Sequence, residues 1–185
     1  MARHINSWHL RQAASALAHG GVIAYPTEAV WGLGCLPDDE QAIGRILELK
    51  QRPWQKGLVV VAASLQQLDD WLLPLDDEAL DQVHPTWPGP VSWVLPCREE
   101  VSPLLRGTHG SLAVRIPDHP LVQALCEEVG PIVSTSANPA GVEPARNTLK
   151  LRTYFGGQLD YILPGDLGGR AQPSEIRTLD GARLR

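Results

Sequence analysis

A single α/β domain is the fold class that the sequence predicts, and three observations support it. The chain has 185 residues, which is enough for one domain with a substantial buried core. Hydrophobic residues make up 43% of it and charged residues 20%, as in an ordinary globular protein. Short apolar runs typical of strands alternate with segments of helical periodicity, which is the pattern of an α/β fold. No repeat, linker or low-complexity segment divides the chain, so we expect one domain over residues 1–185.

Two helices and one strand are predicted in the first third of the chain. The first helix has Ser7 as its N-cap and ends at a pair of glycines. The strand follows at residues 22–25, where β-favouring apolar residues are stopped by a proline. The second helix begins at the acidic residues 38–40, which suit the positive end of a helix. Its apolar positions recur at helical spacing up to Lys50.

Polar residues follow the strand 22–25 directly. Thr27 and Glu28 come at its end, and the loop expected after them contains Gly32 and Gly34. Polar groups at the end of a buried strand are held by a rigid scaffold and stay open to a ligand. An ordinary strand with a glycine-containing exit loop has the same pattern, so this stretch by itself leaves both interpretations open.

The middle of the chain is predicted to contain strands and short helices. Three apolar runs have strand length: residues 58–61, 91–95 and 112–116. Two short helices, 65–72 and 77–83, are expected after the first run, with Ser64 and Asp76 as their N-caps. Residues 97–110 are polar and contain glycine, so we expect a loop there. The short helices leave room for antiparallel strand pairs.

The last third continues the alternation of helix and strand. A helix begins at His119 and Pro120, since proline is tolerated in a first helical turn, and it ends at Gly130. The next predicted elements are a strand, a polar loop, a helix and a strand, at residues 131–133, 134–147, 149–155 and 161–163. The tail from Pro164 onward is expected to form loops.

Charge and cysteine content limit the possible functions. The formal charge of −5 does not indicate a nucleic-acid partner. Residues 57–97 contain six acidic and no basic residues, so the rest of the chain has a formal charge of about +1 and can form a locally basic site. Three cysteines without a C-x-x-C pair argue against a disulfide framework and a zinc site. With no signal peptide and no apolar run near the ~20 residues of a membrane span, we expect a cytoplasmic protein without membrane contact.

Three cations in seven residues form the first candidate site. They lie at the end of the second predicted helix, in the segment KQRPWQK, residues 50–56. In an extended chain, side chains two residues apart share a face, so Lys50 and Arg52 can converge on a phosphate or carboxylate. Arginine can bind such a group through two parallel hydrogen bonds. The alternative is a solvated cluster that complements the negative end of the helix.

Two further candidate sites lie on or next to predicted strands. Arg115 interrupts the apolar segment SLAVRIP, residues 111–117. It either aims a guanidinium at a ligand from a rigid strand or lies on a solvent-facing side of that strand. The segment STSAN, residues 134–138, directly follows the strand 131–133. Its hydroxyls, amide and backbone N–H groups can form a cradle for phosphates, or they can be ordinary turn and cap residues.

Several well-known catalytic motifs are absent from the sequence. No P-loop of the form G-x-x-x-x-G-K-[ST] occurs, and no G-x-G-x-x-G follows a strand, so any ATP must bind in another arrangement. The six histidines are scattered and form no H-E-x-x-H motif. No G-x-S-x-G nucleophile motif is present either. These absences argue against a zinc enzyme and against a hydrolase.

Six segments together resemble the YrdC-type threonylcarbamoyl-AMP synthase family. They are PTEAVWGLGC (26–35), KQRPWQKGL (50–58), TWPGPVSWVLP (86–96), SLAVRIP (111–117), STSANPAG (134–141) and PSEIR (173–177). They occur in the order that the family shows and cover most of the chain. The best agreement is with the short, single-domain members of the family.

The resemblance implies a fold and a reaction. The fold would be a single-domain twisted sheet of mixed parallel and antiparallel strands, flanked by helices, with a large basic cavity on its concave face, as in the YrdC/RibB fold. The reaction would join L-threonine, bicarbonate and ATP into threonylcarbamoyl-AMP and release pyrophosphate. Mg²⁺ would bridge the phosphates, although no set of carboxylates in the sequence must hold it. The product would pass to downstream proteins that make the t6A modification at adenosine 37 of tRNA.

The resemblance also implies roles for single residues. Lys50, Arg52 and Lys56 match the basic motif of the family and are expected at the phosphates, with Lys50 and Arg52 as the catalytic pair. Arg115 matches an arginine that would bind the carboxylate of threonine. Other threonine contacts are expected at Thr27, Ser134 and Ser174, and other ATP contacts at Ser111, Ser136 and Asn138. Pro144 replaces a hydroxyl that longer relatives can offer to the nucleotide, so we expect that contact to be absent.

Two other functions stay open on the sequence alone. An RNA-binding factor in tRNA or ribosomal RNA maturation would also use a basic cavity, although the overall charge of −5 favours a small-molecule enzyme over strong RNA binding. A carbamoyl-adenylate-handling domain of a larger carbamoyltransferase has the same fold, but the chain length and the lack of zinc-finger cysteines argue against it. The role of Glu28 also stays open between orienting a basic residue, assisting the metal and capping a turn.

Overall fold

Eight short strands form one sheet in the computed structural model, which describes residues 6–184. The strands are β1 (Ile23–Pro26), β2 (Trp31–Gly34), β3 (Val59–Val61), β4 (Val91–Pro96), β5 (Ser111–Arg115), β6 (Ile132–Ser136), β7 (Tyr161–Ile162) and β8 (Glu175–Thr178). Their order in the sheet is β7-β1-β2-β6-β3-β5-β4-β8. The pairs β1–β7, β3–β5 and β4–β8 are parallel, and the other four are antiparallel. This mixed sheet confirms the predicted fold class.

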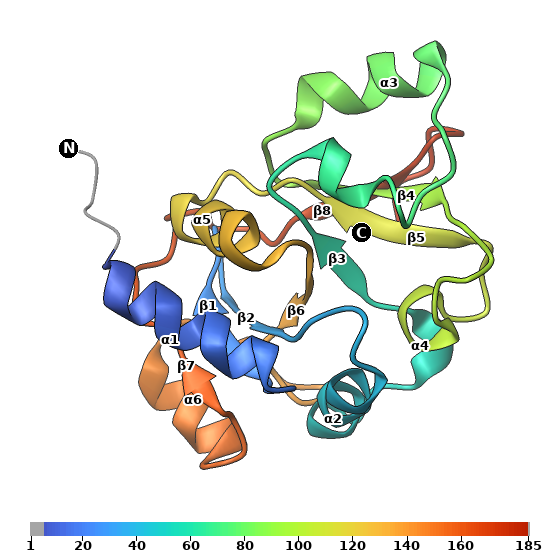
Figure 1. Cartoon of the computed structure of the whole chain (residues 1–185). Coiled ribbons are helices and arrows are strands. Elements are labelled where there is room, and N and C mark those ends of the chain that lie inside the picture. Colours follow the sequence, from blue (N-terminus) through green and yellow to red (C-terminus); the bar gives the residue numbers. More distant parts are fainter. Residues whose placement is uncertain (1–5, 185) are drawn as a thin grey trace.

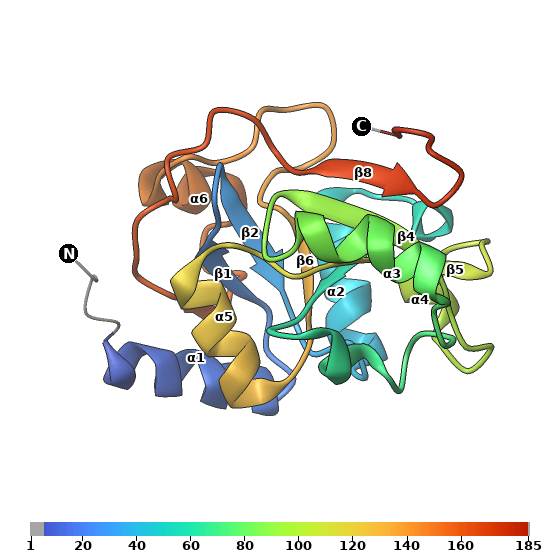
Figure 2. The ribbon, with the colours of Figure 1, turned by 90° about the horizontal axis from the view of Figure 1, so that it is seen from above.

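Helices lie on both faces of the sheet. They are α1 (Ser7–Ala18), α2 (Glu40–Lys50), α3 (Asp77–Val83), α4 (Pro103–Arg106), α5 (Pro120–Val129) and α6 (Thr148–Phe155). Three short 3-10 helices complete the regular structure: η1 (Trp54–Lys56), η2 (Leu65–Leu68) and η3 (His84–Thr86). Figures 1 and 2 show α1 and α5 next to each other, and α6 lies beside the edge of the sheet formed by β7 and β1.

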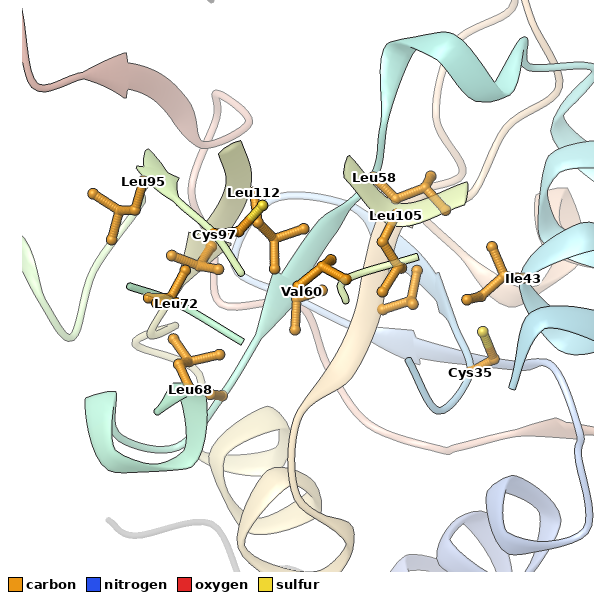
Figure 3. Close-up of a cluster of buried hydrophobic side chains, with 14 of the residues drawn as sticks. Cys35, Ile43, Leu58, Val60, Leu68, Leu72, Leu95, Cys97, Leu105 and Leu112 are labelled. Atoms are coloured by element: carbon orange, nitrogen blue, oxygen red, sulfur yellow. The ribbon is translucent and has the colours of Figure 1, made fainter. Parts of the chain in front are cut away.

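Consecutive residues of β3 show how the two faces are covered. Val60 packs in the larger apolar cluster, which includes Ile43 and Ile46 of α2. Val61 packs in a second cluster with residues of α1 and α5. Because successive side chains of a strand point to opposite faces, α2 covers one face and α1 with α5 the other. In Figure 3, Val60 lies in the larger cluster between Leu72 and Ile43.

Residues 31–34 form β2, although the sequence predicted a loop there. This strand pairs antiparallel with β1, with Ile23 opposite Gly34. A Cβ atom on Gly34 would collide with the backbone carbonyl oxygen of Val133 and would lie only 2.8 Å from Cε1 of the fully buried Tyr25. Glycine is therefore present because the neighbouring strand β6 and the Tyr25 ring both approach this position closely, and it marks close packing instead of a turn.

Smaller differences from the prediction concern short elements. The N-cap of α1 is Asn6, one residue before the predicted Ser7. The helix predicted at 65–72 is only the single turn η2, and the Ser64 side chain makes no capping hydrogen bond. The expected loop 97–110 contains α4, and the tail contains β8. Elements this short have little intrinsic stability and depend on tertiary contacts, which a local sequence pattern does not show.

One connection joins the two edges of the sheet. Strands β7 and β8 are its two edge strands, and residues 164–174 lead from one to the other. We call this segment the strap. Figure 2 shows the chain passing from the region of α6 above the sheet to β8 at the opposite edge. The strap therefore crosses the sheet and can cover a site on it.

Candidate functional site

A cavity of about 170 Å³ lies beside the middle of the sheet. The turn between β1 and β2 forms one wall, and residues of β3, β5 and β6 form the floor. Arg170 and residues 172–174 of the strap line it from the other side. The cavity therefore brings together five segments that are far apart in the sequence, and most of the candidate residues lie in them.

Strand pairing explains why particular side chains reach this cavity. Val59 lines the cavity and lies opposite Ser134, while Val61 lies opposite Arg115. Val59 and Val61 are two residues apart on one strand, so these positions share a face of the sheet. Ser136 follows Ser134 by two residues and points to the same face. Strand β6 thus extends through Ser136, and these hydroxyls lie on a strand instead of in the predicted polar loop.

A buried ion pair joins Arg115 to Glu28. Nη1 of Arg115 lies 2.7 Å from Oε1 of Glu28, and the two side chains are only 7% and 6% exposed. The backbone N–H of Asp118 donates a second hydrogen bond, of 3.0 Å, to the same oxygen. Burial raises the pKa of Glu28, but the charge and the hydrogen bond of Arg115 outweigh this and hold the pKa below its ordinary value. The structure thus shows Glu28 orienting a basic residue.

The remaining donors of Arg115 are open to a ligand. Among residues 6–184, its Nη1 donates to Glu28, whereas its Nε and Nη2 donate to no protein acceptor. The residue lines the cavity. A guanidinium has five N–H donors in a planar fork, so one side can pair with Glu28 while the other binds a carboxylate. This arrangement fits a clamp for an anionic group held from a rigid strand.

The hydroxyl of Thr27 is positioned by the turn that follows β1. It donates a 2.7 Å hydrogen bond to the carbonyl oxygen of Val30, and the backbone N–H of Thr27 donates to the same oxygen. Thr27 is buried and lines the cavity. Because the hydroxyl proton is already used, its oxygen lone pairs remain as acceptors. Thr27 is therefore suited to a ligand donor such as an ammonium group.

Arg52 is the member of the predicted basic cluster that lines the cavity. Its Nε and Nη2 both donate to the carbonyl oxygen of Gly57, at 3.1 and 2.9 Å. Burial lowers the pKa of Arg52 from its ordinary value, although arginine stays charged in proteins. The sequence interpretation assumed an extended chain between Lys50 and Arg52, but the chain is not extended there. Gln51 has the left-handed conformation, with φ 50°, and it ends α2.

Lys50 lies beneath the loop that follows β6. Its Nζ donates to the carbonyl oxygens of Ser136 and Asn138, the latter at 3.0 Å, and the residue is 5% exposed. The backbone N–H of Ala140 donates to the carbonyl oxygen of Lys50. Lys50 does not line the cavity, so in this structure it connects the end of α2 to the loop after β6.

The other predicted residues divide into two groups. Ser174 lines the cavity from the strap, together with the serines of β6. Lys56, Ser111 and Asn138 do not line it. The amide of Asn138 donates to the carbonyl oxygen of Val142 and shapes its own loop. The structure thus collects six of the predicted residues around the cavity: Thr27, Arg52, Arg115, Ser134, Ser136 and Ser174.

The strap is fixed to the turn after β1. The N–H groups of Gly168 and Arg170 donate to the carbonyl oxygens of Thr27 and Glu28, at 3.0 and 2.9 Å. Nε2 of His119 lies 3.0 Å from the carbonyl oxygen of Asp166. These contacts place the strap directly against two residues of the site.

Sequence reasoning missed the cavity-lining residues of the strap before Ser174. Arg170 and Gln172 both line the cavity and were assigned only to a loop-rich tail. One signal was present, because Arg170 follows two glycines and precedes the segment PSEIR that was identified as a motif. A pair of glycines before an arginine is consistent with a close backbone approach to a site.

Neither a metal-binding cluster nor a membrane-spanning helix is found among residues 6–184. In the part of the chain that the structure describes, no three His, Cys, Asp or Glu side chains are placed to hold a metal ion. Glu28 is the carboxylate of the cavity, and it is already paired with Arg115. No helix within residues 6–184 combines the length and apolar character needed to span a bilayer.

Comparison with known proteins gives close relatives over nearly the whole chain. A protein from Pseudomonas aeruginosa named threonylcarbamoyl-AMP synthase is 54% identical over 175 residues, which are 95% of this chain and 95% of that protein. A protein of the same name from Hahella chejuensis is 50% identical over 183 residues, covering 98% of this chain and 100% of that protein.

Solved structures and a family model agree with these relatives. The structure of P. abyssi Sua5 complexed with L-threonine superposes with a TM-score of 0.91 at 33% identity and covers 99% of this chain. This chain spans only 55% of the Sua5 chain. E. coli YciO superposes with a TM-score of 0.84 at 26% identity, covering 97% of this chain and 89% of its own. The family model Sua5_yciO_yrdC, described as "Telomere recombination", matches residues 15–185. The chain therefore belongs to the Sua5/YciO/YrdC family.

Proposed function

We propose that this protein is a threonylcarbamoyl-AMP synthase, which uses L-threonine, bicarbonate and ATP and releases pyrophosphate. The observation that carries the proposal is a cavity lined by two arginines from different strands and loops, Arg115 of β5 and Arg52 after α2. The relatives from Pseudomonas aeruginosa and Hahella chejuensis, which have this name, support it. The complex of P. abyssi Sua5 with L-threonine supports the choice of amino acid.

Threonine occupies the end of the cavity near Glu28. Its carboxylate pairs with the donors of Arg115 that the ion pair leaves open. The lone pairs of Thr27 accept from its ammonium or carbamate N–H, and Ser134 and Ser174 supply further polar contacts. Glu28 keeps the Arg115 guanidinium in one orientation, so the carboxylate is bound in a fixed position.

The phosphates of ATP lie at the other end, near Arg52 and Ser136. The guanidinium of Arg52 is bonded to Gly57, just before β3, whereas Arg115 lies opposite Val61 at the end of β3. The backbone positions next to the two arginines are four residues apart along this segment, which is roughly 13 Å for an extended chain. This separation supports the binding of an amino acid and a phosphate chain side by side.

The chemistry in this site consists of positioning and charge neutralisation. The neutral threonine amine attacks the carbon of bicarbonate, so an N–C bond forms, a C–O bond breaks and water leaves. An oxygen of the resulting carbamate then attacks the α-phosphorus, and the bond to the β-phosphate breaks to release pyrophosphate. Holding both reactants in line lowers the entropic barrier, and cations at the phosphates stabilise the leaving group. Lys50 and Arg52 are the proposed catalytic pair, and Lys50 acts through the end of β6, where Ser136 lies, and through the loop that follows it.

The remaining nucleotide contacts belong to the same proposal. Lys56, Ser111 and Asn138 contact ATP when it is bound, although they do not line the cavity as it stands. Mg²⁺ would enter with the phosphates of ATP, because it is commonly bound through substrate phosphates and retained waters.

The cellular setting follows from the proposed reaction. The product serves the t6A modification at adenosine 37 of tRNA and passes to downstream proteins, with weak RNA contact at most. A cytoplasmic location suits three cysteines that are buried and unpaired, because free thiols persist in a reducing compartment. Residues 1–185 act as one YrdC-like domain.

Pyrophosphate release tests the function. The purified chain is incubated with ATP and Mg²⁺, with and without threonine and bicarbonate, and pyrophosphate is measured. We expect release only when both are present. Release that does not depend on threonine, or no release at all, would refute the synthase and favour a binding protein.

A further inference from the structure

Arg170 is a cavity residue to which the proposed mechanism gives no role. It lies on the strap, is exposed, and lines the cavity beside Glu28 and Ser174. Its backbone N–H donates to the carbonyl oxygen of Glu28 at 2.9 Å, so its Cα is fixed relative to the site. None of the ion pairs and side-chain hydrogen bonds among residues 6–184 involves its guanidinium. A cation held at a cavity without a counter-charge is available to an anionic ligand.

The glycines before Arg170 show that the strap is built to lie close to the site. A Cβ atom on Gly168 would lie 2.9 Å from the Cα of Glu28, which is backbone that cannot easily move. Gly169 has φ 81°, in the region that favours glycine. The close approach of Gly168 to Glu28 and the turn at Gly169 together place Arg170 at the cavity.

Charge at the cavity leaves room for an anion beyond the carboxylate of threonine. Three arginines and one glutamate line it, a formal charge of +2. Glu28 offsets Arg115, which leaves Arg52 and Arg170 without an opposing carboxylate. Threonine is a zwitterion whose carboxylate already has Arg115, and a second guanidinium near it would repel its ammonium group. A phosphate chain with several negative charges fits the two remaining cations.

The size of the cavity also indicates that a nucleotide would reach Arg170. At about 170 Å³ it is smaller than the roughly 300–1,000 Å³ of pockets that enclose larger ligands. A nucleotide must therefore extend past the rim of the cavity, and Arg170 is an exposed cation at that rim.

We propose that Arg170 is a further nucleotide-binding residue, whose guanidinium binds a phosphate oxygen of ATP from the strap while Arg52 binds from the side of β3. This inference rests on the proposed function, because ATP is its ligand. The strap then has a role in substrate binding as well as in covering the site.

Binding measurements on variants test this inference. Arg170→Ala and Arg170→Lys are compared with Arg11→Ala, which removes an exposed arginine of α1, a helix that contributes no residue to the cavity. Calorimetry gives the dissociation constants of ATP and of threonine for each protein at one salt concentration, and thermal melting checks folding. A hydrogen bond to a charged group corresponds to a loss of about 10- to 100-fold when it is removed.

The result expected for Arg170→Ala is a 10- to 100-fold weaker ATP affinity with threonine affinity changed less than about twofold. Arg170→Lys should retain part of the affinity, and Arg11→Ala should match the wild type. Equal ATP affinity in Arg170→Ala and the wild type would overturn the inference while the proposed function stands. Weaker threonine binding with unchanged ATP binding would also overturn it. A wild type that binds no ATP would overturn both.

Discussion

The Arg115–Glu28 pair is the residue-scale feature on which the proposed binding of threonine rests. Both side chains are more than nine-tenths buried, and Arg115 is the donor that the carboxylate would meet. Removing one member of a buried pair leaves the other charge uncompensated, which typically costs about 3–5 kcal/mol. The pair therefore links the stability of the fold to the shape of the site.

We expect Glu28→Ala to lower the free energy of unfolding by about 3 kcal/mol and to weaken threonine affinity at least tenfold. Urea denaturation and calorimetry measure the two effects. The double variant Glu28→Ala, Arg115→Ala is the matched control. It should recover part of the lost stability but none of the threonine affinity, because no buried charge is left unpaired. A double variant that is destabilised by the sum of both single changes would contradict this account.

The ion pair also predicts a pH dependence. The pKa of Glu28 is held below its ordinary value of 4.5 in the folded protein, so the unfolded state binds this proton more readily. Its contribution to stability is therefore complete above about pH 4.5 and is lost as the pH falls through the folded-state pKa. The difference in unfolding free energy between the wild type and Glu28→Gln, measured in urea from pH 7 to pH 3, should shrink below pH 4.5. A constant difference would rule out the linkage.

Lys50 and Arg52 should respond differently to removal. Lys50 is buried and donates to two carbonyl oxygens, so Lys50→Ala should lower the free energy of unfolding by about 1–3 kcal/mol and also reduce activity. Arg52 is only half-buried, so Arg52→Ala should lose at least tenfold in kcat/KM with a smaller change in stability. Denaturation curves and pyrophosphate release on the same samples compare the two. Wild-type turnover in Arg52→Ala would contradict a role at the phosphates and favour the alternative, that the cations at residues 50–56 form a solvated surface cluster.

The strap is the element that the sequence did not reveal. It joins β7 and β8 at opposite edges of the sheet and contacts the backbone of Thr27 and Glu28. The conformation of such a segment is set by long-range contacts, whereas local patterns report only that it lacks periodicity. The strap covers one side of the cavity, because it lines the cavity and is hydrogen-bonded to the turn after β1.

Gly168→Ala tests the strap as an element. The added Cβ would lie 2.9 Å from the Cα of Glu28, so the strap must move away from the turn after β1. We expect a KM for ATP raised several-fold and a lower melting temperature. Gly157→Ala is the control, because a Cβ there meets nothing within 4 Å. If both variants behave alike in kinetics and melting, the close contact of the strap has no functional role.

At the scale of the whole molecule, the order of elements was predictable, and their long-range pairing was not. Asp76 was correctly predicted as the N-cap of α3, and α2 and α5 were placed nearly to the residue, because caps and helical periodicity are local. Strand β2 was missed because Gly34 packs against the Tyr25 ring, a contact that no local pattern contains. The strand β8 was missed because it is defined by its pairing with β4, which is far away in the sequence.

In the candidate site, too, local sequence patterns identified individual residues but not the distant residues that they contact. Arg115 was identifiable as a charge within an apolar strand, and the structure places it at the cavity. Its partner Glu28 is 87 residues away in sequence, so their pairing needed the fold. Lys50 was identifiable as a cation, but it lies in the last turn of α2 and donates to the loop after β6, a contact that is far away in the sequence. Residue types could be predicted, but their partners could not.

A single domain over residues 1–185 predicts one cooperative unfolding transition. The strap and the continuous sheet connect both edges, so neither half has a complete sheet of its own. Unfolding in urea should give the same midpoint by tryptophan fluorescence and by far-ultraviolet circular dichroism. Two separated transitions would show that the chain folds as two units.

Detection of the product itself tests the central claim most directly. The purified protein is incubated with ATP, Mg²⁺, L-threonine and carbon-13-labelled bicarbonate, and the nucleotides are analysed at once by mass spectrometry. The account predicts that the wild type forms threonylcarbamoyl-AMP with the labelled carbon and an equal amount of pyrophosphate. At low threonine, Arg115→Ala should form neither product. An adenylate without the label, or ATP left unchanged in the wild type, would contradict it.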